Sequence, residues 1–431
     1  MINTINQEKK FSNKQAILIY LIVALFLVFE MAVQVAPSVM APNLMRDLNL
    51  GTFDLGLMSG FYFYTYAIMQ IPSGLLFDRF KPKFIIIISI LVCTLGTLLF
   101  GLATNFYLGC LSRLLTGLGS AFAFVSVLFV ASDIFEKKYF ALMTGITQML
   151  AAFGAMLGQM PISFLVHHLG WQNTMFSLSG MGLGLATLVW FIMNYDGSSK
   201  QNNIECFSNS LSIKNSLKII IFKPQTWYIA LYALLLWAPM SGFASLWGVQ
   251  FLIKVYSLNT TSAAFYCSLM WLGLAIFSPL LGIFATSINN KWLPLVLSAC
   301  MGSITFGLIL GIELPYYFLV ICLLLAGGAC AGQSLSFALI QENNPKSVKA
   351  TAFAFNNMAI VISGAIFQPL IGFLISKNHL NEMSPTYPIG DYKFGLIIIL
   401  IAYIFAMLIS ILLIRKKRKY FQKSTMKSSI T

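Results

Sequence analysis

Charged side chains are scarce in this sequence of 431 residues: they make up 9% of it, whereas hydrophobic residues make up 58%. A soluble domain carries about a quarter of its residues as charged side chains, and one soluble core stops growing at roughly 250–300 residues. A soluble protein of this length could not hide so much apolar surface. The scarcity of charge therefore excludes a soluble globular fold and indicates that much of the surface faces lipid.

The residue patterns of enzymes and metal sites are also missing. The seven cysteines are scattered, mostly inside apolar runs, and form no Cys-x-x-Cys pair. The three histidines fall in short polar segments, and no glycine-rich phosphate loop or nucleophile-plus-base pattern stands out. We therefore read the cysteines as small packing residues, and predict no metal, no cofactor and no enzymatic activity.

What the sequence does have is long, continuous apolar runs, such as residues 84–103 and 394–414. Backbone groups in lipid must be paired within the segment, so only helices and closed barrels span a membrane. Barrel strands would alternate over segments of roughly ten residues, and these runs do not alternate. The sequence predicts an all-α membrane protein with twelve transmembrane helices, including a retained first span from residue 16 rather than a cleaved signal.

The apolar windows fall into two sets of six, separated by a polar stretch. The first set is expected near residues 16–41, 55–77, 84–104, 107–134, 140–166 and 171–194, and the second near 226–253, 262–286, 292–312, 315–340, 350–375 and 394–414. The predicted parts are an N-terminal segment 1–15, a six-helix bundle 16–194, a linker 195–225, a second six-helix bundle 226–414 and a basic tail 415–431. Similar spacings in the two sets also suggest distant repeats, as rocking transporters require.

The positions of the basic residues predict the orientation. The net charge of +14 could suggest nucleic-acid binding, but Lys and Arg sit almost wholly in short segments between apolar runs. With the N-terminus in the cytoplasm, the cytoplasmic segments hold 22 of the 27 Lys and Arg residues and the outer loops hold four. This asymmetry predicts that both termini and the linker are cytoplasmic, in a plasma (inner) membrane, with no nucleic-acid partner.

One loop carries a family resemblance. The stretch after the second span reads Gly74-Leu-Leu-Phe-Asp78-Arg79-Phe-Lys81-Pro-Lys83. It resembles the signature loop between helices 2 and 3 of the major facilitator superfamily, although Lys81 stands where a second glycine is usual. The resemblance implies two six-helix bundles around a central cavity. It also implies that Gly74, Asp78, Arg79 and, at the end of span 4, Asp133 form a cytoplasmic conformational gate.

Spans 4 and 5 extend the resemblance. Arg113-Leu-Leu-Thr-Gly117-Leu-Gly119 is similar to the family's second signature. Gly154-x-x-x-Gly158 resembles the family's Gly-Pro motif, with the proline displaced to position 161. Glycines of this kind let helices approach closely, so the glycines of both motifs are expected to serve helix packing. The resemblance also implies that spans 3, 6, 9 and 12 lie at the periphery, while spans 1, 4, 7 and 10 surround the cavity.

Glu30 is the strongest candidate for a functional residue. It lies about fifteen residues into the first apolar run, near mid-bilayer, with Gln34 one turn away on the same face. Apolar surroundings disfavour a charged carboxylate, so Glu30 could exchange a proton or contact a substrate. The plain alternative is a hydrogen bond that locks two helices together.

Other polar residues within the spans are weaker candidates. Arg113 could attract an anionic substrate, or it could be a structural pin that holds span 1 or 2. Trp237, Trp247, Gln250, Ser336 and Gln368 are equally open to a helix–helix role, as are the three tyrosines 62, 64 and 66. The further candidates for substrate or coupling-ion contacts are Gln333, Asn356 and Asn357.

Taken together, these patterns predict a secondary active transporter that moves a small polar or amphipathic solute by alternating access. No ATP-binding loop is present, so an ion gradient, of protons, is expected to drive uptake. The protein is expected to be a monomer. The closest likeness is to organic-anion, sugar-phosphate and lysosomal-dipeptide permeases. The alternatives are an efflux antiporter for drugs or a siderophore, and a non-transporting membrane sensor, for which the linker and tail leave little room.

Overall fold

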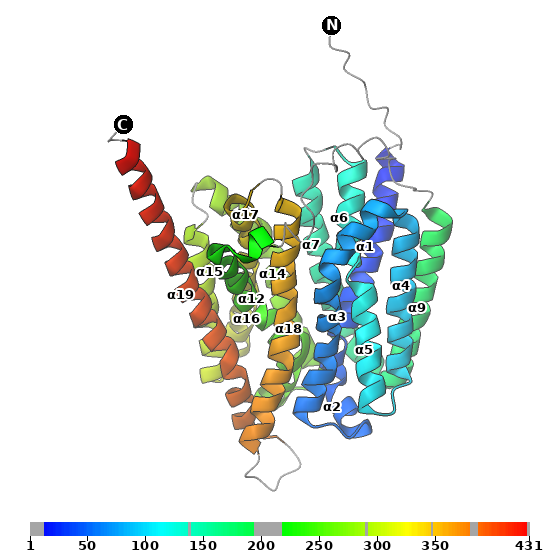
Figure 1. The fold of residues 1–431 in the computed structure, drawn as a ribbon. Helices are drawn as coiled ribbons and strands as arrows, with labels where there is room; N and C mark the ends of the chain where they lie inside the picture. Colours follow the sequence, from blue (N-terminus) through cyan, green and yellow to red (C-terminus); the bar gives the residue numbers. More distant parts are fainter. Residues whose placement is uncertain are drawn as a thin grey trace.

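The computed structural model describes residues 13–136, 139–193, 218–288, 292–345, 348–379 and 387–428, the last of these ranges by its backbone alone from residue 414 on. Across these ranges the chain is almost entirely helical and forms no β-strand. The all-α prediction is therefore confirmed. The helices form two groups that follow one another along the chain and lie side by side (Figure 1).

The first group begins with a helix that breaks at Pro37, where the missing backbone N–H and the ring interrupt the helical pattern. It consists of α1 (Asn13–Val35), α2 (Pro37–Asp47), α3 (Thr52–Arg79), α4 (Pro82–Gly101), α5 (Phe106–Ser120), α6 (Ala123–Ile134), α7 (Phe140–Leu157), α8 (Met160–Leu169) and α9 (Trp171–Ile192).

The second group is interrupted by a π-helical segment and by one 3₁₀ turn. It consists of α12 (Pro224–Ala238), the π-helical η3 (Pro239–Trp247), α13 (Gly248–Tyr256), α14 (Thr260–Ser287), α15 (Trp292–Gly311), α16 (Tyr316–Cys330), the 3₁₀ turn η4 (Ala331–Gln333), α17 (Ser334–Asn343), α18 (Lys349–His379) and α19 (Ile389–Ser428).

Eleven helical stretches of the described chain are long and apolar enough to cross a membrane, and they coincide with eleven of the twelve predicted spans. The remaining predicted span is α3, whose 28 residues are ample for the ~30 Å hydrocarbon core. Its tyrosines and Gln70 make it less apolar than its neighbours. That composition fits its position, since α3 packs against α5 on one side and against α18 of the other group.

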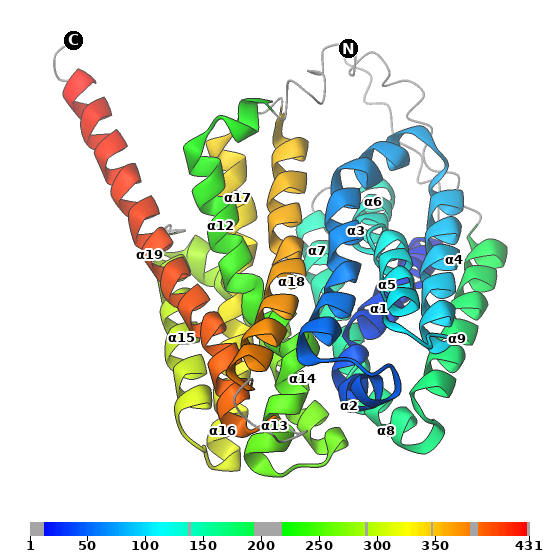
Figure 2. The same cartoon turned by 60° about the horizontal axis from the view of Figure 1, so that its bottom comes forward.

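The helices share one long axis, which gives the molecule two ends. Helix α1 begins and α19 ends at the same end, drawn uppermost in Figure 1 and called here the terminal face. The short helices α2 and α8 lie at the other end, the opposite face, as Figure 2 shows from below. The two groups meet where α3 packs against α18 and where α7 packs against α14.

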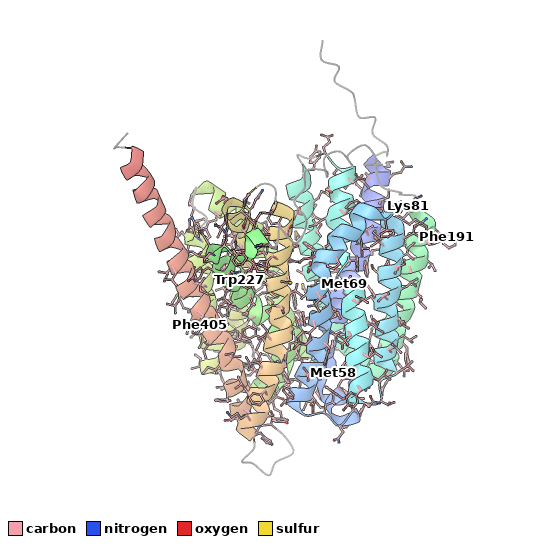
Figure 3. The ribbon with its side chains drawn as sticks, in the orientation of Figure 1. Met58, Met69, Lys81, Phe191, Trp227 and Phe405 are labelled. Carbon is pink, nitrogen blue, oxygen red and sulfur yellow. The ribbon has the colours of Figure 1, made fainter. Side chains whose placement is uncertain are left out.

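The outer surface is rich in apolar side chains. Phe191 of α9 is 76% exposed and Phe405 of α19 is 53% exposed, and Figure 3 shows both on the outer flanks of the molecule. Exposed patches of this kind are rare on soluble monomers. They fit a surface that faces hydrocarbon. They lie on α4, α9, α15 and α19, the helices predicted to be peripheral, and also on α1, α14 and α16.

Glycines allow the closest helix crossings in the first group. A Cβ atom at Gly119 would lie 2.5 Å from the Ser89 carbonyl oxygen of α4. One at Gly154 or Gly158 would lie 2.5 Å from a carbonyl oxygen of α1, and one at Gly117 would overlap the Tyr62 carbonyl of α3. Each of these four predicted packing glycines therefore lies where two backbones touch, which fixes α5 against α3 and α4, and α7 against α1.

Candidate functional site

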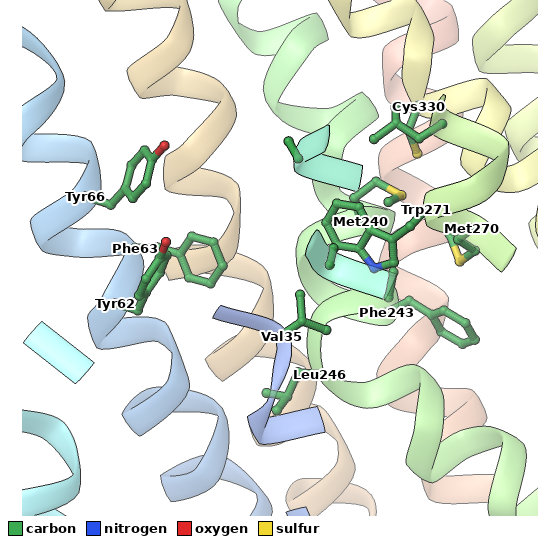
Figure 4. Close-up of a cluster of buried hydrophobic side chains, with 14 of the residues drawn as sticks. Val35, Tyr62, Phe63, Tyr66, Met240, Phe243, Leu246, Met270, Trp271 and Cys330 are labelled. Carbon is green, nitrogen blue, oxygen red and sulfur yellow. The ribbon is translucent and has the colours of Figure 1, made fainter. Parts of the chain in front are cut away.

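A cavity of about 110 Å³ lies between the two groups of helices. Its walls come from α1, α3, α6 and α7 on one side and from α12, α14, η4, α17 and α18 on the other. Figure 4 shows Tyr62 and Tyr66 of α3 on one side of this region and Trp271 of α14 on the other. Because both groups supply its walls, any relative movement of the groups changes the shape of the cavity.

Glu30 reaches this cavity from α1 and has no exposed surface. The Tyr62 hydroxyl donates a 2.7 Å hydrogen bond to its Oε2 atom. Its Oε1 atom has no hydrogen-bond partner among the described residues. An unpaired carboxylate oxygen away from water is unfavourable, so a proton or a bound solute would stabilise this arrangement.

Arg113 does not reach the cavity. Its side chain is buried, with Nη1 3.3 Å from the Val33 carbonyl oxygen and Nη2 3.2 Å from that of Gln34. The guanidinium also lies over the Tyr62 ring, 4.8 Å from its centroid. Four residues after Val33 stands Pro37, which has no N–H to donate to the Val33 carbonyl. Arg113 thus pairs with the polar end of a broken helix, and the geometry matches the structural pin among the two predicted roles.

The remaining candidates divide between the cavity and the helix contacts. Gln34, Gln333 and Asn357 line the cavity, and Asn357 Nδ2 donates to Gln70 Oε1 across the two groups at 2.5 Å. Asn356 is fully buried and turns away from the cavity, donating at 2.7 Å to the Ser336 hydroxyl of α17. Neighbouring residues of one helix point about 100° apart, so these two asparagines face different partners.

Two residues of this region escaped the sequence analysis, one of them in the cavity wall. Trp271 was not singled out, although an indole in the middle of a span, rather than at its end, is a signal that could have found it. Its Nε1 atom is buried and has no partner among the described residues. Gln70, which lies outside the cavity wall but accepts a hydrogen bond from Asn357, was missed as well, despite being an amide within an apolar run. Trp247, in contrast, lies outside the cavity and donates to the Gln368 carbonyl at 3.0 Å.

The cavity has more walls than expected. Spans 1, 4, 7 and 10 do line it, but α3, α7, α14 and α18, which form spans 2, 5, 8 and 11, supply most of its aromatic and amide side chains. The expectation of four cavity helices was therefore incomplete. Close crossings at Gly117, Gly154 and Gly158 hold α3 against α5 and α7 against α1, and side chains of α3 and α7 reach the cavity. Among the described residues, α4, α9, α15 and α19 supply none of its walls.

Four hydrogen bonds between the two groups lie toward the opposite face, whereas those of Gln70 with Asn357 and of Tyr64 with the Ala365 carbonyl lie nearer the middle of α3. Thr52 Oγ1 donates to the Gly372 carbonyl at 2.9 Å, and Gln159 Nε2 donates to the Ala244 carbonyl at 2.6 Å. Further pairs of this kind are Ser163 with Thr261 and Gln250 with the Ser38 carbonyl. Between the cavity and the opposite face, the two groups are therefore joined.

The predicted gate lies at the terminal face. Gly74 is exposed in the last turns of α3, with open space where a Cβ would stand. Asp78 and Arg79 end the same helix, but their side chains lie outside the described residues. Asp133 is half-buried near the end of α6 and makes an interaction there.

Comparison with known families gives a consistent match. The model of the Major Facilitator Superfamily matches residues 21–369. A probable sulfoacetate transporter of Cupriavidus necator is 28% identical over 167 residues, which are 39% of each chain. A probable galactarate/D-glucarate transporter of Escherichia coli is 25% identical over 179 residues, 40% of each chain. The matched stretches thus span about two fifths of these relatives' own length.

Solved structures resemble the fold over nearly its full length. A bacterial homologue of the human lysosomal transporter Spinster, in an inward-facing and occupied conformation, matches with a TM-score of 0.75 and 17% identity, covering 94% of this chain and 98% of the other. A nucleoside transporter matches with a TM-score of 0.73 and 13% identity, covering 92% and 99%. At these identities the likeness extends to the fold alone.

Proposed function

The chain belongs to the major facilitator superfamily, and we propose that it carries a small polar or amphipathic solute through the central cavity with coupling to protons. Members of this fold transport by alternating access, in which two helix groups rock around a central site. The observation that carries the proposal is the cavity itself. It is walled by both groups, and it contains a buried carboxylate with one unpaired oxygen.

The direction of opening follows from the charge distribution. The excess of Lys and Arg in the predicted cytoplasmic segments favours cytoplasmic termini, in the plasma (inner) membrane. In that orientation the terminal face is cytoplasmic. The bonds of Thr52 and Gln159 to the second group then lie on the outer side of the cavity, whereas the Asn357–Gln70 bond joins the groups at the cavity wall. The arrangement is then inward-facing. Closure of the terminal face in the other state is assigned to Gly74, Asp78, Arg79 and Asp133, with one monomer as the working unit.

Proton coupling is assigned to Glu30. Its burial disfavours the charged form, while the Tyr62 hydroxyl stabilises it. A group balanced in this way can gain or lose a proton when its surroundings change. Gln34, Gln333 and Asn357 supply amides for solute contacts. The family relationship favours a transporter over the sensor considered above, and the relatives named above, whose names denote carriers of small organic solutes, agree with a small cargo.

Transport by purified protein in liposomes tests this proposal. A panel of small radiolabelled solutes is supplied with and without a pH gradient, and accumulation is followed before and after a protonophore. We expect gradient-dependent movement of at least one solute, absent from protein-free liposomes. Ala151→Phe, which fills the cavity wall, should stop it, whereas Gly180→Phe on exposed α9 should not. Solute movement that depends neither on the pH gradient nor on the Ala151→Phe substitution would contradict the proposal.

A further inference from the structure

The charge of the cavity restricts what can bind there. Glu30 is the one acidic or basic residue among the described residues that line it, and no Lys, Arg or His joins it. The nearest arginine, Arg113, is paired with the Val33 and Gln34 carbonyls, at the negative end of the α1 dipole. An organic anion entering this cavity would therefore meet a carboxylate and no facing cation. The cavity is unsuited to anions.

Aromatic rings surround the same space. Tyr62 and Tyr66 line it from α3, and Trp237 and Trp271 line it from the second group. The two indole rings pack edge to face, with centroids 6.3 Å apart. Aromatic faces attract cations, and the attraction grows when water is excluded. Rings on both sides of the cavity thus suit the body and the charge of an amphipathic cation.

Three buried polar atoms complete the site. Glu30 Oε1 and Gln333 Oε1 are acceptors, and Trp271 Nε1 is a donor, and none has a hydrogen-bond partner among the described residues. Their residues are at most 7% exposed, and all three line the cavity. Buried polar groups normally find partners. Two acceptors, one of them ionisable, match a solute that carries N–H donors.

We propose that this cavity recognises a small amphipathic organic cation, a protonated amine on an apolar or aromatic body. The ammonium group pairs with Glu30 and Gln333, while the rings of Tyr62, Tyr66 and Trp271 enclose the body. This substrate class rests on the proposed function, since it names the solute for the same cavity. It differs from the organic-anion likeness suggested by the sequence.

The same geometry sets the form of coupling. A proton on Glu30 removes the charge that the ammonium group needs, so proton and solute exclude one another. The other titratable groups that act on Glu30 are Tyr62 and Tyr66 of α3, Arg113 of α5 and Cys93 of α4. All four are buried, and none is a second carboxylate. Mutual exclusion yields proton-for-cation exchange, the antiport alternative, rather than symport.

Binding to the purified full-length protein in detergent tests the charge preference directly. The probes are 2-phenylethylammonium, 2-phenylethanol and 3-phenylpropionate, which are similar in size and differ in charge. A ligand that binds the folded state raises the midpoint of thermal unfolding, and tryptophan fluorescence reports the cavity independently. We expect the cation to bind at least about tenfold more tightly than the other two, ~1.4 kcal/mol. Its affinity should fall as the pH is lowered.

Variants assign the preference to Glu30. Glu30→Gln should remove the advantage of the cation, whereas Glu313→Gln, at an exposed acid outside the cavity, should keep it. Equal binding of all three probes, tighter binding of the anion, or binding of none overturns the inference, and these wild-type comparisons need no variant to fold. Failure of the proposed function is a separate result, because it appears as absent transport in liposomes whatever the probes do in detergent.

Discussion

Arg113 donates to the carbonyl oxygen of Val33, the one that Pro37 deprives of its helical partner. The break between α1 and α2 places this polar helix end beside the cavity, and the guanidinium covers it. A residue that its place within an apolar span made a candidate for anion binding thus contacts the end of α1 instead. This leaves Glu30 as the only acidic or basic residue that lines the cavity among the described residues.

Removing Arg113 should therefore cost stability. Arg113→Met removes a donor from both carbonyls and leaves that of Val33, to which Pro37 cannot donate, unpaired. A buried group without its partner costs about 1–3 kcal/mol. Thermal unfolding in detergent measures the loss. Arg46→Met is the matched control, since the Arg46 side chain is 72% exposed and should change the midpoint little.

A double-mutant cycle isolates the mechanism. Pro37→Ala supplies a backbone N–H four residues after Val33, so Arg113→Met should cost about 1 kcal/mol less in that background. Independent, additive losses would mean that Arg113 acts elsewhere. A midpoint unchanged by Arg113→Met, together with lost binding of 3-phenylpropionate, would return the arginine to an anion-binding role.

The sequence alone predicted the helical spans well, because a run of about twenty apolar residues is typical of a transmembrane helix and of few other structures. It also found Glu30, since depth in an apolar run can be counted. The hydrogen-bond partners of Arg113 could not be predicted from the sequence, because they depend on how α5 crosses the break between α1 and α2. Asn356 and Asn357 are another example. The helical period predicts that their side chains point in different directions, but only the packing of α18 determines that Asn356 contacts Ser336 and Asn357 lines the cavity.

The orientation is tested by reporter fusions. Fusions at Lys200 and after Lys419 should show the activity of a cytoplasmic reporter, because the basic segments are expected to stay inside. A fusion after Lys254, in a predicted outer loop, provides the control and should show activity only with an exported reporter. Exported-reporter activity at Lys200 or Lys419 would reverse the assigned faces.

Closure of the opposite face depends on a glycine. A Cβ at Gly372 would overlap the Thr52 carbonyl, so Gly372→Ala should separate α3 from α18 and favour the state open at that face. Phe53 and Phe373 lie across this contact, with ring centroids 6.2 Å apart. Spin labels at these two positions, in a background without native cysteines, should report a longer distance in Gly372→Ala. Gly180→Ala, which meets nothing within 4 Å, is the control and should leave the distance unchanged.

The coupling role of Glu30 is tested by removing its charge while keeping its shape. Glu30→Gln can still accept the hydrogen bond from Tyr62, but it can neither take up nor release a proton. Coupling needs the protonation state to bias the two conformations, and a bias of ~1.4 kcal/mol shifts their balance about tenfold. The variant should therefore lose accumulation driven by a pH gradient.

Exchange of labelled for unlabelled solute should persist in the same variant, because it requires rocking of the loaded protein and no proton. Higher solute concentrations will be needed, since the neutral amide attracts an ammonium group less strongly. Glu313→Gln should accumulate solute as the wild type does. If Glu30→Gln also accumulates at the wild-type level, and a protonophore still abolishes that accumulation, the proton is carried by another group and Glu30 is a structural partner of Tyr62.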